Sequence, residues 1–215
     1  TSMYQNVRVV DVKLNSILNN IFPGPKFGIN GIRKIIGHSN SILCPVLKPQ
    51  GLSSDDLASL AYDFIISGAD MIKEDHNLSN QNYSTFRDRI EKITKAVNKA
   101  NKEAGKRAMY FPHVSSNFET IIEDIHFAIS AGVDGIMLIP SLVGYNFVHH
   151  ISKNKQFDLP IISHPSFSGG HVLSESHGIE HGVYYGTLQR IIGADMSIFP
   201  NTGGRFEFSR DQCLS

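Results

Sequence analysis

Residues 68–76 constrain the fold of this chain most, because a short apolar strand pattern there ends in four ionisable side chains. Side chains alternate between the two faces of a strand, so Lys73 and Asp75 share one face and Glu74 takes the other. Burying a charge is costly unless it is paired or bound to a metal. The pattern therefore predicts an ion-pair network or a functional site, with Glu74 in a structural role.

Composition narrows the classes of protein that the chain can belong to. Its 215 residues are 41% hydrophobic, which is enough for the core of one globular domain. The formal net charge is zero, so a nucleic-acid partner is not expected. Apolar runs such as 136–139 are too short to span a bilayer, which predicts no membrane segment. Cys44 and Cys213 are too few for a disulfide framework, and we expect a cytoplasmic protein.

Strand-like and helix-like segments alternate along most of the chain, after a short helical pattern at 28–37. Strict alternation predicts an α/β fold with parallel strands and right-handed crossovers. A (β/α)₈ barrel and an open doubly wound sheet both fit, although no G-x-G-x-x-G motif follows the first strand. The expected strands are 42–48, 70–75, 109–113, 135–140, 160–164 and 196–200, and the expected helices are 53–67, 84–104, 118–131, 143–152 and 182–192.

Polar side chains gather where the predicted strands end. In a parallel α/β protein these ends meet on one face, where ligands bind. We therefore expect a site built from several strands. Its candidate residues are Lys48, Lys73, Asp75, His76, His113, His164, Gly203, Gly204 and Arg205.

The lysines and the aspartate each have two interpretations. Lys48 either extends to solvent or acts as a base that takes a proton from carbon, and its spacing alone favours the first. Lys73 and Asp75 form either an ion pair or a Mg²⁺ site. A lysine ammonium cannot bind a cation, so the second interpretation requires CO₂ to convert Lys73 into a carbamate.

Ten histidines are present, so some lie near the strand ends by coincidence. His76, His113, His164 and His171 are candidates for a histidine metal cluster, and His164 is the best candidate for function because it ends a strand and precedes a proline. Five others are expected at the surface: His126, His149, His150, His177 and His181. Residues 203–205, Gly-Gly-Arg, are either an anion cradle or an ordinary turn.

Three segments together resemble the ribulose bisphosphate carboxylase (RuBisCO) large-chain superfamily, and its RuBisCO-like (type IV) branch in particular. They are 22–29 (Phe-Pro-Gly-Pro-Lys-Phe-Gly-Ile), 48–53 (Lys-Pro-Gln-Gly-Leu-Ser) and 68–76. The resemblance implies the C-terminal (β/α)₈ barrel of that family, with about six of its eight βα units present. It implies a lead-in segment over 1–40 and a partial catalytic barrel over 41–215.

The same resemblance implies roles for the site residues. Lys73 corresponds to the lysine that CO₂ carbamylates, Asp75 to a Mg²⁺ ligand and Lys48 to the base that takes a proton beside the ketose carbonyl. His76 stands at the last metal position, and His164 at the strand-five active-site histidine. Residues 203–205 are the predicted phosphate contacts.

Departures from the carboxylase pattern change the expected reaction. His76 replaces a glutamate ligand, Gln50 replaces a lysine, and Pro165 and Ser168 replace an arginine and a histidine. The resemblance thus implies a Mg²⁺-dependent enolase, isomerase or decarboxylase acting on a phosphorylated ketose or sugar acid through an enediolate. The alternatives are ribulose-1,5-bisphosphate carboxylase and a non-catalytic homologue. We expect a homodimer or higher oligomer of the full-length protein, and no activity from this chain alone.

Overall fold

A row of six parallel strands forms the centre of the molecule in the computed structural model, which describes residues 4, 6–16, 18–204 and 208–214. A parallel bridge between His113 and Met137 joins two groups of three strands. The row follows chain order without the reversal found in a doubly wound sheet. The strands are β2 (Val46–Leu47), β3 (Met71–Glu74), β4 (Met109–Phe111), β5 (Ile136–Leu138), β6 (Ile161–Ser163) and β8 (Met196–Ser197).

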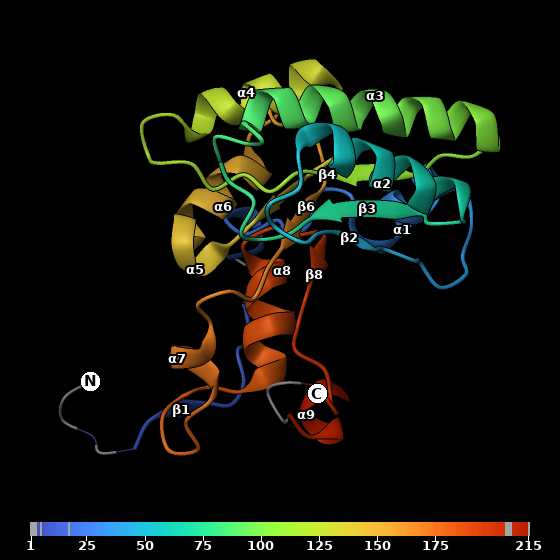
Figure 1. The fold of residues 1–215 in the computed structure, drawn as a ribbon. Helices are drawn as coiled ribbons and strands as arrows, with labels where there is room; N and C mark the ends of the chain where they lie inside the picture. The colour runs from blue at the N-terminus through green and yellow to red at the C-terminus, as the bar shows by residue number, and fades with distance from the viewer. Residues whose placement is uncertain (1–3, 5, 17, 205–207, 215) are drawn as a thin grey trace.

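A helical segment lies between each pair of consecutive strands in the row, as the alternation predicts. Figure 1 shows α2, α3 and α4 together over one side of the strands. The expected helix at 143–152 is divided, because Pro140 begins a short helix and Gly144, with φ of 96°, separates it from the next. The helical segments are α2 (Ser54–Ile66), α3 (Phe86–Ala104), α4 (Ile121–Ala131), α5 (Pro140–Val143), α6 (Tyr145–Lys153), the π-helix η2 (Val183–Leu188) and α8 (Gln189–Ile191).

Local sequence explains where these helices begin and end. The Ser53 hydroxyl accepts a hydrogen bond from the Asp56 N–H, and the Asp56 carboxylate accepts one from the Ser53 N–H, forming a capping box. Gly105 and Gly132 end α3 and α4 in the left-handed conformation that glycine adopts without strain. These boundaries agree with the sequence predictions.

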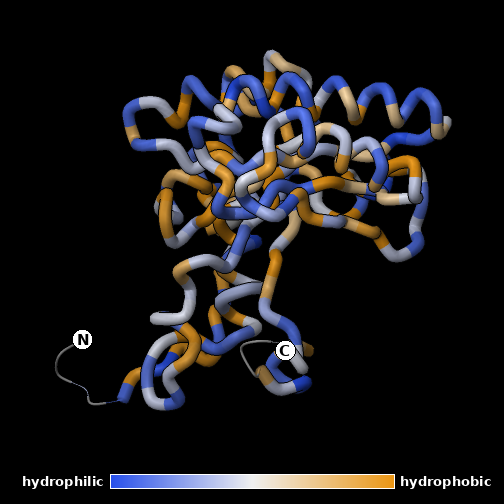
Figure 2. The backbone as a smooth tube through the Cα atoms, viewed as in Figure 1, coloured by the Kyte–Doolittle hydropathy of each residue, from blue (hydrophilic) through white to orange (hydrophobic). Residues whose placement is uncertain are grey.

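The two faces of the strands pack against different partners. One face carries an apolar row that includes Met71, Phe111, Met137 and Ile162. The opposite face, which includes Ile72, packs beneath the helices. Figure 2 shows hydrophobic residues concentrated through the strands and mostly hydrophilic residues along α3. The strands are therefore covered on one face by helices and line a second core with the other.

Helix α1 (Gly28–Ile36) covers the second core at the amino ends of the strands. Its Ile32 and Ile36 are buried against the apolar row. The Asp195 carboxylate accepts hydrogen bonds from the N–H groups of Phe27, Gly28 and Ile161, at 2.7, 2.8 and 2.9 Å. One carboxylate thus ties the start of α1 to the start of β6.

Several short elements were not predicted. β1 (Arg8–Val9) pairs in parallel with β7 (Gly178–Ile179), and this pairing joins segments about 170 residues apart. The others are η1 (Leu18–Asn20), α7 (Gly169–Val172) and α9 (Arg210–Leu214). No helix in the described part of the chain is long and apolar enough to cross a membrane. Cys44 and Cys213 are both free.

Glu74 lies on the helix-covered face of β3 and is fully buried, in agreement with its predicted structural role. Its carboxylate accepts hydrogen bonds from Arg89 Nε at 2.7 Å and the Tyr110 hydroxyl at 2.6 Å. It also accepts one from the His113 N–H at 3.0 Å. The side chain of Arg89, on α3, is likewise fully buried. This network connects β3 to α3 and β4.

Replacing Arg89 with methionine should destabilise the protein strongly, because it leaves the Glu74 charge buried without its cation. We expect a loss of about 3–5 kcal/mol in the free energy of unfolding, measured by urea denaturation. Lys92→Met is the control, because Lys92 lies on the same helix α3 but forms only surface ion pairs, with Asp55 on α2 and with Asp88 on α3. Equal losses in the two variants would contradict this account.

Candidate active site

The candidate site continues the apolar row beyond the ends of the strands. Because side chains alternate, the face that carries Met71 next presents Lys73 and then Asp75, and the face that carries Phe111 next presents His113. On β6, the face that carries Ile162 next presents His164. This face of the strands is therefore apolar along most of its length and polar at the carboxyl ends.

Lys73 is buried, with 8% of its surface exposed. Its ammonium donates to the Glu74 carbonyl at 3.3 Å, and none of the ion pairs among the described residues joins it to Asp75. Burial lowers the pKa of Lys73 and the charge of Lys48 lowers it further, whereas Cys44 and Asp75 act in the opposite direction. A lowered pKa increases the fraction of neutral amine, which is the form that reacts with CO₂.

Asp75 is oriented by its neighbour. Its Oδ1 accepts hydrogen bonds from the backbone N–H and the side-chain amide of Asn77, at 2.9 and 3.0 Å. Burial raises the pKa of Asp75, but these hydrogen bonds and the nearby His76 and Lys48 produce a net decrease. Asp75 is therefore an anion in a fixed orientation beside Lys73.

His76 and His164 stack, with ring centroids 4.4 Å apart and an angle of 21° between the planes. The Ser166 N–H donates to His164 Nδ1 at 3.2 Å, so the proton of the neutral ring lies on Nε2. Burial, followed by Lys73, His76 and His113, lowers the pKa of His164 to about 3. His164 is thus a neutral hydrogen-bond donor at physiological pH.

The predicted histidine cluster is not formed. Within the described residues, no three His, Cys, Asp or Glu side chains lie where they could hold a metal ion. His171 instead stacks on Tyr184, and His113 donates from Nδ1 to the Leu78 carbonyl at 2.8 Å. His181 was expected at the surface, but it is 3% exposed and packs against aromatic rings, because it lies beneath the segment that carries Phe208.

The remaining predicted residues have different outcomes. Lys48 follows β2 and is exposed, although its charge acts on Lys73, Asp75 and His76. Gly203 and Gly204 lie in an exposed turn, where the Gly204 N–H donates to the Asn201 carbonyl at 3.3 Å. Arg205 lies outside the described residues. The anion cradle at 203–205 stays a prediction.

A cavity of about 460 Å³ opens beside the two stacked histidines. Its walls are mainly apolar and come from the segment after β6, from η2 and from the end of β8. No local sequence pattern predicts this cavity, because its walls come from segments far apart in the chain. The residues that line it include His76, His164, Phe167, Val172, Leu173, Tyr185, Ile198 and Phe199.

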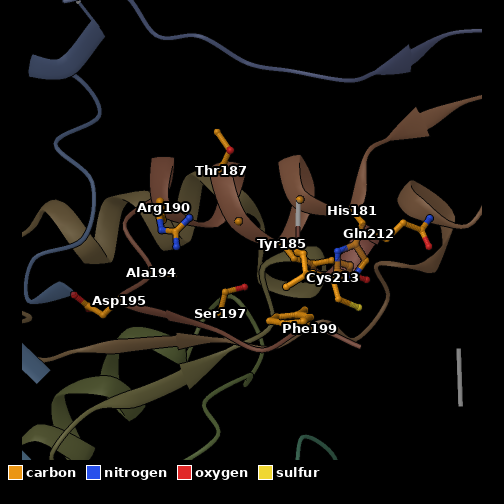
Figure 3. A pocket seen from close by; sticks show the side chains of 13 residues that line it. His181, Tyr185, Thr187, Arg190, Ala194, Asp195, Ser197, Phe199, Gln212 and Cys213 are labelled. Carbon is orange, nitrogen blue, oxygen red and sulfur yellow. The ribbon is translucent and has the colours of Figure 1, made fainter. Parts of the chain in front are cut away.

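A second cavity, of about 340 Å³, lies between η2–α8 and β8 (Figure 3). Arg190, Asp195 and Ser197 line it. Ser197 is on the opposite face of β8 from Met196 and Ile198, which belong to the apolar row. This cavity is therefore on the outer side of the strands, away from Lys73 and Asp75.

Comparison with known proteins identifies the family. The sequence profile described as "Ribulose bisphosphate carboxylase large chain, catalytic domain" matches residues 28–211. The chain belongs to the RuBisCO large-chain family. Its similarity to proteins named RuBisCO-like places it in the RuBisCO-like branch, as the resemblance of its motifs implies.

Three relatives in the RuBisCO family illustrate the match. The 5-methylthioribulose-1-phosphate isomerase of Rhodospirillum rubrum is 33% identical over 99% of this chain and 56% of its own length. The 2,3-diketo-5-methylthiopentyl-1-phosphate enolase of Geobacillus kaustophilus is 29% identical over 99% of this chain and 52% of its own length. The crystal structure of a RuBisCO-like protein from Rhodopseudomonas palustris, 35% identical, superposes with a TM-score of 0.88 over 95% of this chain and 56% of that chain. The chain thus spans about half the length of its curated relatives.

The state of His164 predicts how stability changes with pH. Folded His164 stays neutral down to about pH 3, whereas the unfolded chain binds a proton on this side chain near pH 6.5. Stability from this residue is therefore complete above pH 6.5 and is lost as the pH falls toward 3. Between pH 6.5 and 4.5 we expect the native sequence to lose about 1–2 kcal/mol more than His164→Asn, measured by urea denaturation at each pH. Parallel pH profiles would show that His164 is not held neutral.

Proposed function

We propose that the protein containing this chain is a Mg²⁺-dependent enolase or isomerase that acts on a phosphorylated ketose through an enediolate. The observation that carries the proposal is the position of Lys73, Asp75 and His164 on one continuous face at the carboxyl ends of β3 and β6. The names of the two curated relatives, an isomerase and an enolase of phosphorylated keto compounds, support the same reaction class.

We infer that the six strands are the first six of a (β/α)₈ barrel. Their chain-order arrangement and the helical connections support this, as does the likeness to RuBisCO-like structures. Residues 1–40 are then a lead-in whose helix α1 closes the bottom of the barrel, and 41–215 are the partial barrel. The full-length protein is proposed to be cytoplasmic and to form a homodimer or higher oligomer.

The residues present fit a hard cation only if Lys73 is carbamylated. Asp75 contributes carboxylate oxygens, and a Lys73 carbamate contributes the oxygens that Mg²⁺ prefers. His76 is a poorer ligand, because its ring lies flat against His164 and its Nε2 is 3.3 Å from the Asn77 amide. When bound, Mg²⁺ stabilises negative charge on the substrate oxygens.

The other side chains have proposed roles in moving protons. Lys48 takes the proton from the carbon beside the ketose carbonyl. His164 donates a hydrogen bond from Nε2 to a substrate oxygen, because Nδ1 is occupied by the Ser166 N–H. Lys48 is exposed in this part of the protein, so the rest of the full-length protein must exclude water from it. Residues 203–205 are proposed to bind the substrate phosphate.

Deuterium exchange tests the reaction. The full-length protein should exchange the C–H proton of a phosphorylated ketose with solvent deuterium, in a manner that depends on Mg²⁺ and bicarbonate. Lys48→Ala, Lys73→Ala and Asp75→Ala should each lower the rate by about 10²–10⁴-fold, whereas Lys92→Ala, on the surface of α3, should not. Exchange that persists in Lys73→Ala and Asp75→Ala would refute the proposal. Fixation of labelled CO₂ into acid-stable product would favour the carboxylase instead.

Carbamylation of Lys73 has a test that does not require activity. Protein incubated with ¹³C-bicarbonate and Mg²⁺ should show one carbamate resonance in ¹³C NMR, because the buried amine has a lowered pKa. The resonance should be absent in Lys73→Ala and present in Lys48→Ala. A carbamate signal that is unchanged in Lys73→Ala would assign the modification to another amine.

A further inference from the structure

The Asp75 loop, residues 75–81, follows β3, and side chains from other parts of the chain bind its backbone. The Ser79 carbonyl accepts a hydrogen bond from Arg89 Nη2, on α3, at 2.9 Å. The Leu78 carbonyl accepts one from His113 Nδ1, after β4, at 2.8 Å. Arg89 and His113 also belong to the buried network that joins β3 to α3 and β4. The core of the protein therefore fixes this part of the loop.

A third carbonyl of the loop, that of Asn77, is bound by two glutamine side chains. Gln50 Nε2 and Gln81 Nε2 each donate to it at 2.8 Å. A carbonyl oxygen has two lone pairs, so the two donors satisfy it completely. Gln81 belongs to the loop itself, and its Oε1 accepts from the Ser79 N–H at 2.9 Å. Gln50 instead comes from the segment after β2, two residues beyond Lys48.

Asn77 in turn sets the orientation of the Asp75 carboxylate. The backbone N–H and the side-chain amide of Asn77 both donate to Asp75 Oδ1, at 2.9 and 3.0 Å. Among the residues that the structure describes, every hydrogen bond to the Asp75 side chain ends on Oδ1, which leaves Oδ2 for a cation. A displacement of Asn77 would therefore rotate the carboxylate and move the oxygen that remains for the ion.

The contact of Gln50 with Asn77 connects the two segments beyond the ends of their strands. The ladder between β2 and β3 ends at Leu47, whose carbonyl accepts from the Asp75 N–H at 3.2 Å. Lys48 lies past this point and is exposed. The Gln50 amide thus joins the segment that carries Lys48 to the Asp75 loop where the strands no longer pair.

We propose that Gln50 is a positioning residue, which acts through Asn77 to hold the Asp75 carboxylate at a fixed place relative to Lys48. The inference rests on the proposed function, in which Asp75 binds Mg²⁺ and Lys48 takes the proton. Gln50 is exposed, so its hydrogen bond contributes little to the stability of the fold. Its effect is on the site, because small displacements of a ligand or a base lower the rate of a reaction that needs both in fixed positions.

Mg²⁺ binding to the full-length protein in bicarbonate, measured by calorimetry, tests the proposal without turnover. Gln50→Met removes the donor at nearly the same side-chain length and should weaken binding about 2–10-fold. Asn77→Ala should also weaken binding. In the Asn77→Ala background the loss caused by Gln50→Met should be smaller, because the side-chain link from Asn77 to Asp75 is gone. Losses that simply multiply in the double variant would show that Gln50 acts by another route, and would overturn the proposal.

Two controls separate positioning from stability. Asn82→Ala changes an exposed side chain just beyond the loop that makes none of these hydrogen bonds, and it should leave Mg²⁺ binding unchanged. The Tm of Gln50→Met should stay within about 2 °C of the native value, because an exposed hydrogen bond is removed. A fall of more than about 5 °C would assign Gln50 to the fold instead and contradict the positioning role.

Failure of the proposed function gives a different result. If the native protein binds no Mg²⁺ in bicarbonate, the Mg²⁺-dependent assignment falls, and the metal-free protein decides about Gln50. The side-chain amide of Asn77 is then followed by ¹⁵N NMR and assigned by its loss in Asn77→Ala. Gln50→Met should shift this resonance and Asn82→Ala should not. A resonance that Gln50→Met leaves unchanged overturns the proposal, whether or not Mg²⁺ binds.

Discussion

The buried ion pair of Glu74 and Arg89 makes the rest of this structure possible. The Glu74 carboxylate accepts hydrogen bonds from the Arg89 guanidinium, the Tyr110 hydroxyl and the His113 N–H. These bonds join β3 to α3 and to β4. Because a strand alternates its faces, the pair also sets the orientation of Lys73 toward the opposite side. Structural charge and candidate catalytic charge are therefore adjacent in sequence but separated by the sheet.

This separation explains the electrostatics of the site. The Glu74 charge is satisfied on the helix side, while Lys73 is buried on the other side, where its ammonium donates to the Glu74 carbonyl. Burial then lowers the pKa of Lys73 without an ion pair to reverse the effect completely. In the proposed function, this neutral amine is the precursor of a metal ligand.

Much of the fold could be predicted from the sequence, because the determining interactions are local. The apolar runs predicted six strands. Ser53 predicted the start of α2, and Gly105 and Gly132 predicted the ends of α3 and α4. The two-residue period of 71–75 separated Glu74 from Lys73 and Asp75. Local patterns could not choose between an open sheet and a barrel, because strand order depends on contacts between distant segments.

The details of the site depend on such distant contacts. His76 and His164 come from loops after different strands, and only the folded chain brings their rings together. The proton on His164 Nε2 follows instead from a local contact, with the Ser166 N–H two residues along the chain, whose geometry no sequence period encodes. The pairing of β1 with β7 likewise joins chain segments that share no motif. His181 was misplaced for the same reason, since two of its aromatic neighbours, Phe199 and Phe208, belong to later segments of the chain.

The row of strands ends at β2 on one side and at β8 on the other, and within the described residues neither has a further neighbour. In the proposed (β/α)₈ barrel, these two edges pair with the two strands that complete it. Closure of the barrel then leaves no open edge, so no strand of the row offers its N–H and C=O groups to another polypeptide.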